Sequence, residues 1–181
     1  MTLSLVTLNP LEMLPPEDPL IDDVLARLQL QDAAATAKER EVETEKEDAC
    51  RYFYKLCRRL DTAFLQPREI TCLFDVDGGW LPGKSCRTVG LIVTTLVIDV
   101  SARARVRPKN GVITITLHRW EAVWSCSVAD RGIFAVQSLS SRPPEFVERL
   151  VKRLNARLEH HATEDGTMTA FTFEPSSRPL H

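Results

Sequence analysis

Two neighbouring segments in the middle of the chain alternate between apolar and polar residues, and this alternation restricts the fold more than any other feature of the sequence. Residues 113–117 read ITITL and residues 122–128 read AVWSCSV, with a short link between them. Because successive side chains of a strand point to opposite faces of a sheet, both segments are predicted strands with one buried face. The short link predicts that the two strands pair as a hairpin.

Three other segments carry apolar residues at the spacing of a helix face, which predicts amphipathic helices over residues 49–64, 89–100 and 146–158. The first helix is expected to stop before Pro67, because proline cannot continue a helix. The three apolar stripes consist of Ala49, Phe53, Leu56, Leu60 and Phe64, then Val89, Ile92, Val93, Leu96 and Val100, then Phe146, Val147, Leu150, Val151, Leu154 and Leu158.

Two more strands are predicted outside the hairpin. Residues 70–76 alternate and end at the turn sequence DGG, and residues 167–173 follow the turn sequence EDG. From residue 51 onward the predicted order is therefore helix, strand, helix, strand, strand, helix, strand. That order predicts an α/β sandwich, in which a mixed, largely antiparallel sheet is covered by helices on one face.

The N-terminal quarter of the chain has a different character from the rest. Residues 1–19 are rich in leucine and proline and are predicted to form an extended arm. Residues 20–48 are predicted to be helical, with a highly charged second half. The domain itself is expected over residues 49–175, followed by a short tail at 176–181. An apolar stripe in the helical segment is predicted to form a homodimer interface, and it consists of Ile21, Val24, Leu25 and Leu28.

The charge balance argues against some classes of binding partner. The 181 residues include 23 basic and 25 acidic side chains, and the resulting net charge of -2 provides no bulk attraction to nucleic acid or to an anionic membrane. Residues 1–19 lack the basic start of a signal peptide and are too interrupted to span a membrane. The five cysteines form no CxxC pair, which favours reduced thiols and a cytoplasmic protein.

Two phrases of the sequence resemble a known family. Residues 90–99, GLIVTTLVID, are similar to a helix written Gly-Leu-Ile-Val-Asn-Glu-Leu-Val-Thr-Asn, and residues 124–132, WSCSVADRG, are similar to a strand and loop written Val-x-Asp-x-Gly. Together with the C-terminal segment DGTMTAFTFEP at 165–175, they resemble the ATP-binding domain of sensor histidine kinases. This domain has the Bergerat or GHKL fold, and the likeness is to its bacterial HWE-like group in particular. The likeness spans residues 49–175 and carries the predicted fold with it.

The resemblance implies a helix that holds Mg²⁺ and triphosphate through oxygen ligands. In this chain Thr94 and Thr95 stand where the family has Asn and Glu, and Asp99 stands at the position of the Asn that holds Mg²⁺. Ala102 and Arg103 occupy the place of a basic pair. Asp99 is then either a residual cation ligand or a solvated helix carboxylate, and the second interpretation is favoured.

The resemblance also implies an adenine site. Asp130 matches the aspartate that receives the adenine amino group, and Gly132 matches the glycine that lets the backbone approach the ring. Phe134 replaces the next glycine of the motif. Residues 135–144 read AVQSLSSRPP and contain none of the glycines whose amides contact phosphates in the family. We therefore expect a vestigial nucleotide site, and a strand end capped by a turn explains Asp130 equally well.

Self-phosphorylation needs a histidine on a helical hairpin before the domain, because an imidazole must reach the γ-phosphate. His118 is expected on the surface of its strand, while His160 and His161 are expected to end the last helix, where a cation suits the helix dipole. His181 lies in the tail, so no histidine precedes residue 118. Adjacent histidines diverge, so no metal site is predicted.

The sequence predicts no catalytic residue and no bound cofactor. The leading hypothesis is a non-catalytic pseudokinase that acts as a homodimer and binds another signalling protein, such as a response regulator or a kinase, in a two-component or stress-response pathway. The main alternative is a nucleotide sensor or kinase that retains ATP and Mg²⁺ through Asp99 and Asp130 and acts on a histidine of another chain. A phosphotransfer protein ranks last, because it needs an acceptor histidine in the helical region.

Overall fold

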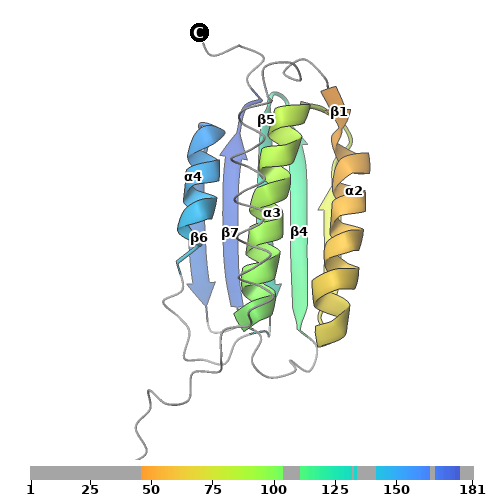
Figure 1. The fold of residues 1–181 in the computed structure, drawn as a ribbon. Coiled ribbons are helices and arrows are strands. Elements are labelled where there is room, and N and C mark those ends of the chain that lie inside the picture. Colours follow the sequence, from red (N-terminus) through yellow and green to blue (C-terminus); the bar gives the residue numbers. More distant parts are fainter. Residues whose placement is uncertain (1–45, 104–110, 132, 134–141, 164–165, 176–181) are drawn as a thin grey trace, which may run out of the picture.

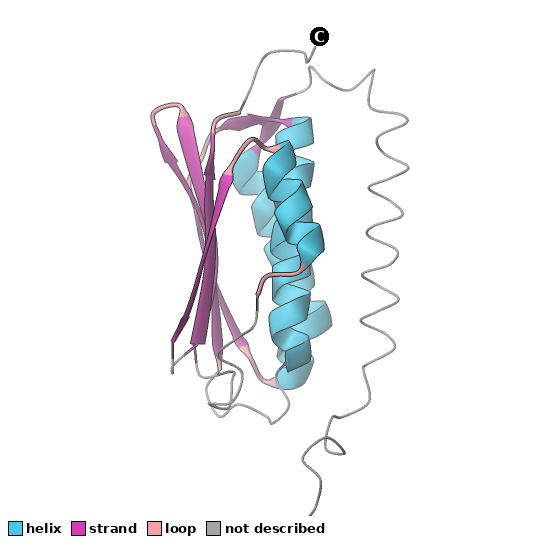
Figure 2. Cartoon of the chain, turned by 90° about the vertical axis from the view of Figure 1, so that its left-hand side faces the viewer, coloured by secondary structure: helices cyan, strands magenta, loops and turns pink. Residues whose placement is uncertain are grey.

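The described helices and the main sheet form two layers, with these helices on one face of the sheet. The computed structural model describes residues 46–103, 111–131, 133, 142–163 and 166–175. Figure 2 shows the sheet edge-on with the helices on one side of it, and Figure 1 looks onto the helix-covered face. The predicted helix-covered sheet is confirmed. The extended arm, the apolar stripe at 21–28 and the tail lie outside the described residues.

The main sheet has five strands in the order β2-β4-β5-β7-β6. β2 runs parallel to β4, and every other neighbouring pair is antiparallel, so the sheet is mixed and largely antiparallel as predicted. The predicted hairpin is the central β4–β5 pair. The strands are β2 (Thr71–Val76), β4 (Val112–Trp120), β5 (Val123–Arg131), β6 (Arg157–Thr163) and β7 (Gly166–Phe173).

The three predicted amphipathic helices form α2 (Ala49–Leu60), α3 (Gly83–Arg103) and α4 (Glu145–Arg153). α2 continues through a π-helical turn and a 3₁₀ turn to Arg68, with Pro67 in the first turn of the 3₁₀ segment, where its missing N–H is tolerated. α3 begins earlier than its apolar stripe suggests. The buried faces of the helices meet the inward-facing side chains of β4, β5 and β7 in one core.

α3 is the central helix of the helical layer. Its side chains are buried on several sides, including Val89, Ile92, Val93 and Val97. Its segment Gly83–Ala102 has a mean hydropathy of 1.4, and by length and composition it is apolar enough to cross a membrane. Because 67% of that segment is buried inside the fold, its hydrophobicity is that of a core helix.

The contact between α2 and α3 depends on a glycine. A Cβ added at Gly90 would lie 2.6 Å from the hydroxyl oxygen of Tyr52, so only a residue without a side chain leaves room for the ring. Tyr52 in turn meets Phe53 edge-on, with ring centroids 5.1 Å apart. Burial raises the pKa of the Tyr52 hydroxyl to about 12.

The predicted helical segment 20–48 is wrong at its end, because Lys46–Asp48 form the short strand β1. β1 pairs antiparallel with β3 (Trp80–Pro82), a strand that the sequence patterns did not indicate. The N–H of Ala49 then donates to the carbonyl oxygen of Gly79 at 2.9 Å, and the Asp48 carboxylate accepts from the Arg51 N–H as the N-cap of α2. Strand pairing and capping therefore break any helix before α2.

The last predicted helix is too long. α4 ends at Arg153, because Asn155 adopts a left-handed conformation with φ of 54° and the N–H of Ala156 donates to the carbonyl oxygen of Val151. The chain then reverses into β6, so His160 and His161 belong to a strand and do not end a helix. Leu158 fits both periods, which explains the error: it continues the helical spacing but faces the core from β6.

Candidate functional site

Asp130 is the buried polar residue around which the candidate site is organised. It lies near the end of β5 on the helix-covered face, with 6% of its surface exposed. The backbone N–H of Thr167 donates to Oδ2 of Asp130 at 3.0 Å, and the Thr167 hydroxyl donates to the same oxygen. These bonds hold the carboxylate in one orientation inside the fold, and such support suits a buried anion.

Gly166 lets β7 approach the backbone of Asp130. A Cβ at Gly166 would lie 2.8 Å from the carbonyl carbon of Asp130 and closer still to its oxygen, and the residue has φ of 156°. The sequence phrase around Gly166 and Thr167 indicated a strand, but it did not reveal that both residues support Asp130, 37 positions away. Only the pairing of β5 with β7 brings them together.

Thr94 and Thr95 turn their hydroxyls back onto α3 itself. The Thr94 hydroxyl donates to the carbonyl oxygen of Gly90 at 2.8 Å, and the Thr95 hydroxyl donates to that of Leu91 at 2.8 Å. Thr95 is also buried, with 1% of its surface exposed. Both hydroxyls are therefore engaged within the helix, and neither replaces the side-chain amide or carboxylate that the resembling family has at these positions.

Asp99 and Asp130 lie at the same end of the domain. Asp99 is in the last turns of α3, which ends at Arg103 before the chain passes to β4. Asp130 is the register partner of Ile113, near the start of β4 (Figure 1). Asp99 is only partly buried. The other residues of the predicted nucleotide site, Gly132 and Phe134, lie outside the described residues.

The residues present fit one end of a nucleotide better than the other. A buried carboxylate fixed by Thr167, beside a close backbone approach at Gly166, suits an adenine amino group. On α3, by contrast, Asp99 is the one carboxylate in the stretch of residues 90–99. A magnesium triphosphate would therefore find a single carboxylate ligand, Asp99, on this stretch of the helix, and no reaction step is derived through it.

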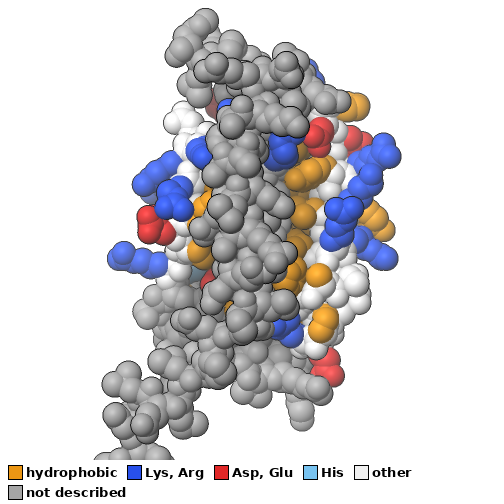
Figure 3. Space-filling view, in the orientation of Figure 1, with side chains coloured by type: hydrophobic (Ala, Val, Ile, Leu, Met, Phe, Trp, Pro, Cys, Tyr) orange, Lys and Arg blue, Asp and Glu red, His pale blue; other side chains and the backbone are white. Residues whose placement is uncertain are grey.

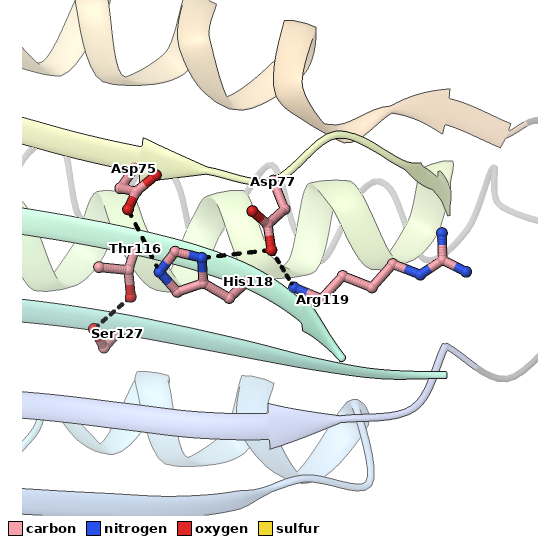
Figure 4. Close-up of polar contacts among 6 residues, drawn as sticks. All are labelled: Asp75, Asp77, Thr116, His118, Arg119 and Ser127. Carbon is pink, nitrogen blue, oxygen red and sulfur yellow. Dashed lines mark hydrogen bonds and ion pairs between the residues drawn. The ribbon is translucent and has the colours of Figure 1, made fainter. Parts of the chain in front are cut away.

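The predicted surface position of His118 is confirmed, on the open face of the sheet. In Figure 4 its ring lies between two carboxylates, with Nε2 3.8 Å from Asp75 and Nδ1 3.5 Å from Asp77. The backbone N–H of Arg119, which donates to Asp77 at 2.8 Å, and the neighbouring His118 hold the pKa of Asp77 below its usual range. Because the two ring nitrogens address different carboxylates, these groups do not converge on one metal ion.

His160 and His161 point to opposite faces of β6. Nδ1 of His160 lies 2.8 Å from the Thr169 hydroxyl, on the helix-covered side, whereas His161 is exposed. No group of three or more potential metal ligands occurs within the described parts of the chain. The five cysteines are free thiols, and burial raises the pKa of the Cys57 thiol to about 12.

Solved structures with the same fold are histidine kinases. The histidine kinase domain of the blue-light activated kinase from Erythrobacter litoralis EL346 has a TM-score of 0.64 and 13% identity, covering 86% of this chain and 85% of that one. A longer structure of that kinase has a TM-score of 0.63 and 18% identity, and the match covers 84% of this chain and 54% of the kinase chain. The mycobacterial sensor histidine kinase MprB has a TM-score of 0.53 and 15% identity, and the match covers 75% of this chain and 99% of the MprB chain.

These likenesses show that the chain has the fold of a histidine kinase ATP-binding domain. Because the identities are 13–18%, they show the fold alone. Neither a protein-family model nor a curated protein sequence matches the chain.

Proposed function

We propose that this chain is a pseudokinase: a signalling protein with the fold of a histidine kinase ATP-binding domain that acts by binding other proteins and transfers no phosphate. The observation that carries the proposal is the state of α3. Thr94 and Thr95, which replace the Asn and Glu of the resembling family, are bonded to carbonyl oxygens of their own helix, so Asp99 is the one carboxylate that residues 90–99 offer to Mg²⁺. Phosphoryl transfer needs a firmly held cation to neutralise the charges of the triphosphate, and the proposal is that this reduced ligand set does not hold one.

The positions of the histidines support the same proposal. A phosphoacceptor imidazole must be exposed, and it must lie on an element that can approach a γ-phosphate. Of the histidines in the described residues, His118 and His161 belong to strands of the sheet, and His160 faces the helix-covered side. None is on a helix. A carboxylate stands on either side of His118, and their charges would oppose the approach of a phosphoryl group.

A non-catalytic protein of this fold would act through its partners. We propose a cytoplasmic homodimer, paired through the stripe Ile21, Val24, Leu25 and Leu28, that binds a response regulator or a kinase in a two-component or stress-response pathway. The arm at residues 1–19 carries apolar side chains, including Leu3, Leu5, Val6 and Leu8, and it is proposed as part of the partner-binding surface.

One observation favours an alternative function. Asp130 is buried, anchored by Thr167 and approached by Gly166, and such a support is what an adenine-binding carboxylate needs. The alternative is therefore a nucleotide sensor, or a kinase acting on a histidine of another chain, that binds ATP through Asp130 and Asp99. The two functions differ in affinity for the nucleotide.

Isothermal titration calorimetry of the full chain with Mg·ATP, and with ATP in EDTA, separates them. The pseudokinase proposal predicts no saturable binding at millimolar ATP. Asp130→Asn is the matched control, because it removes the charge while keeping the shape, and circular dichroism shows whether it remains folded. A dissociation constant in the low micromolar range that Asp130→Asn abolishes would overturn the proposal and establish the nucleotide sensor.

A further inference from the structure

A pocket on the outer side of α2 lies apart from the candidate nucleotide site. Its volume is about 440 Å³, and it runs from β1 along two turns and more of α2. Trp80 of β3 forms one wall and keeps 66% of its surface exposed. In Figure 3, Lys and Arg side chains flank hydrophobic side chains over α2, on the right of the view. The lining residues are Glu47, Asp48, Arg51, Tyr52, Lys55, Leu56, Arg59 and Trp80.

Three basic side chains of α2 line this pocket and carry positive charge that no described carboxylate neutralises. Arg51, Lys55 and Arg59 are spaced four residues apart, so they share one face of α2. Within the described residues no carboxylate pairs with any of the three. The two acidic lining residues are engaged elsewhere: Asp48 accepts from the Arg51 backbone N–H at 3.2 Å, and Glu47 lies 3.8 Å from Arg87. α2 contains four basic and no acidic residues.

The pocket therefore fits a segment that combines carboxylates with apolar side chains. Leu56, Tyr52 and Trp80 supply the apolar surface, and the basic row supplies the complementary charge. The chain itself carries such a segment immediately before β1. Residues 32–45, DAAATAKEREVETE, contain five acidic and two basic side chains together with alanines and a valine. These residues lie outside the described part of the chain.

Connectivity favours this segment over a free partner. Residue 45 precedes Lys46 of β1, and the next two residues of β1, Glu47 and Asp48, line the pocket. From residue 45 the segment must return past the three residues of β1, about 10 Å, and then along about 15 Å of α2 to reach Arg59. Fourteen residues reach about 46 Å when extended. The segment can therefore double back along α2. A short tether also gives an effective concentration in the millimolar range, which a dissolved partner must exceed.

We propose that residues 32–45 dock intramolecularly in the α2 pocket, with their carboxylates on Arg51, Lys55 and Arg59 and their apolar side chains against Trp80 and Leu56. This inference does not depend on the proposed loss of catalysis. It assigns the charged half of the N-terminal segment to the domain and leaves the apolar stripe at residues 21–28 available to a second copy.

Photo-crosslinking in the full-length protein tests the proposal. Trp80 is replaced by p-benzoylphenylalanine, which keeps an aromatic wall, and irradiated protein is examined by denaturing gel and by mass spectrometry of peptides. The expected product has the mass of one chain and joins position 80 to residues 32–45. The same amino acid at Met168, which is exposed on a β-strand of the open sheet face, is the control and should give no such product.

Charge reversal then tests the chemistry. Arg51→Glu, Lys55→Glu and Arg59→Glu together should lower the crosslink yield at least tenfold, and Glu39→Lys, Glu41→Lys and Glu43→Lys in the same chain should restore it. The matched control reverses three exposed basic residues elsewhere, Arg131, Lys152 and Arg157, and should leave the yield unchanged.

A product with the mass of two chains would overturn intramolecular docking and show that a second copy occupies the pocket. Crosslinks to residues 1–19, or no crosslink with Trp80 replaced in a protein that circular dichroism shows to be folded, would overturn the choice of segment. A yield that is indifferent to the triple reversal would overturn the electrostatic basis.

Discussion

Substituting Gly166 by alanine gives the sharpest check on how β7 supports Asp130. The added Cβ would lie 2.8 Å from the carbonyl carbon and 2.9 Å from Oδ1 of Asp130, and the carbonyl oxygen is nearer still. Because two of these atoms belong to backbone in the sheet, the contact is relieved only by moving β7 away from β5. Overpacking of this kind costs about 1–3 kcal/mol, and weakening the Thr167 N–H bond to Asp130 costs about 1 kcal/mol more.

We therefore expect Gly166→Ala to lower the free energy of unfolding by about 2–4 kcal/mol, which corresponds to a fall of about 10 °C in Tm for a chain of this size. Urea denaturation followed by circular dichroism measures it. Gly78→Ala is the control, because nothing lies within 4 Å of a Cβ at that position, and its effect should stay within about 0.5 kcal/mol. Equal stabilities of the two variants would refute the reasoning.

Four further outcomes are expected. In native protein Cys50 should react with a thiol reagent at pH 8 much faster than the four other cysteines, which are wholly or partly buried, and comparable rates would contradict the described core. Because the pKa of Asp77 is lowered on folding, its contribution to stability is present above the ordinary aspartate pKa and is lost as the pH falls below it, so Asp77→Asn should flatten the acid limb of a stability-pH profile. Val24→Glu with Leu28→Glu should give a folded monomer in light scattering, and a persistent dimer would place the interface elsewhere. Deleting residues 1–17 should leave Tm nearly unchanged while abolishing capture of a purified cognate response regulator or kinase, and a large fall in Tm would show that the arm is structural instead.

The local patterns of the sequence predicted most of the secondary structure. The hairpin was predictable because ITITL and AVWSCSV alternate with period two and stand close together, and both became central strands. The helices were predictable from their apolar stripes. β1 and β3 were missed because three-residue strands are too short to show a period, and they form only because Lys46–Asp48 and Trp80–Pro82 meet.

The candidate site was predictable only in part. Asp130 and Asp99 were identified through a resemblance, and the structure places both at one end of the domain. The partners of Asp130 were not predicted. Thr167 is remote in sequence, and nothing local to it signals a bond to a carboxylate on another strand.

The sequence by itself determined which segments have an apolar face to bury in a core. It also determined that α3 carries Thr94 and Thr95 where the resembling family has Asn and Glu. These properties are local, because side-chain periodicity and residue identity need no neighbour in space. Only the tertiary structure decided the strand order, in which β2 lies parallel to β4 and β6 forms an edge, and it alone ended α4 at Arg153. Those outcomes depend on long-range hydrogen bonds between strands and on the left-handed conformation of Asn155. The position of Leu158 fits the spacing of a helix and that of a strand equally well, and its pairing with Phe171 of β7 places it in a strand.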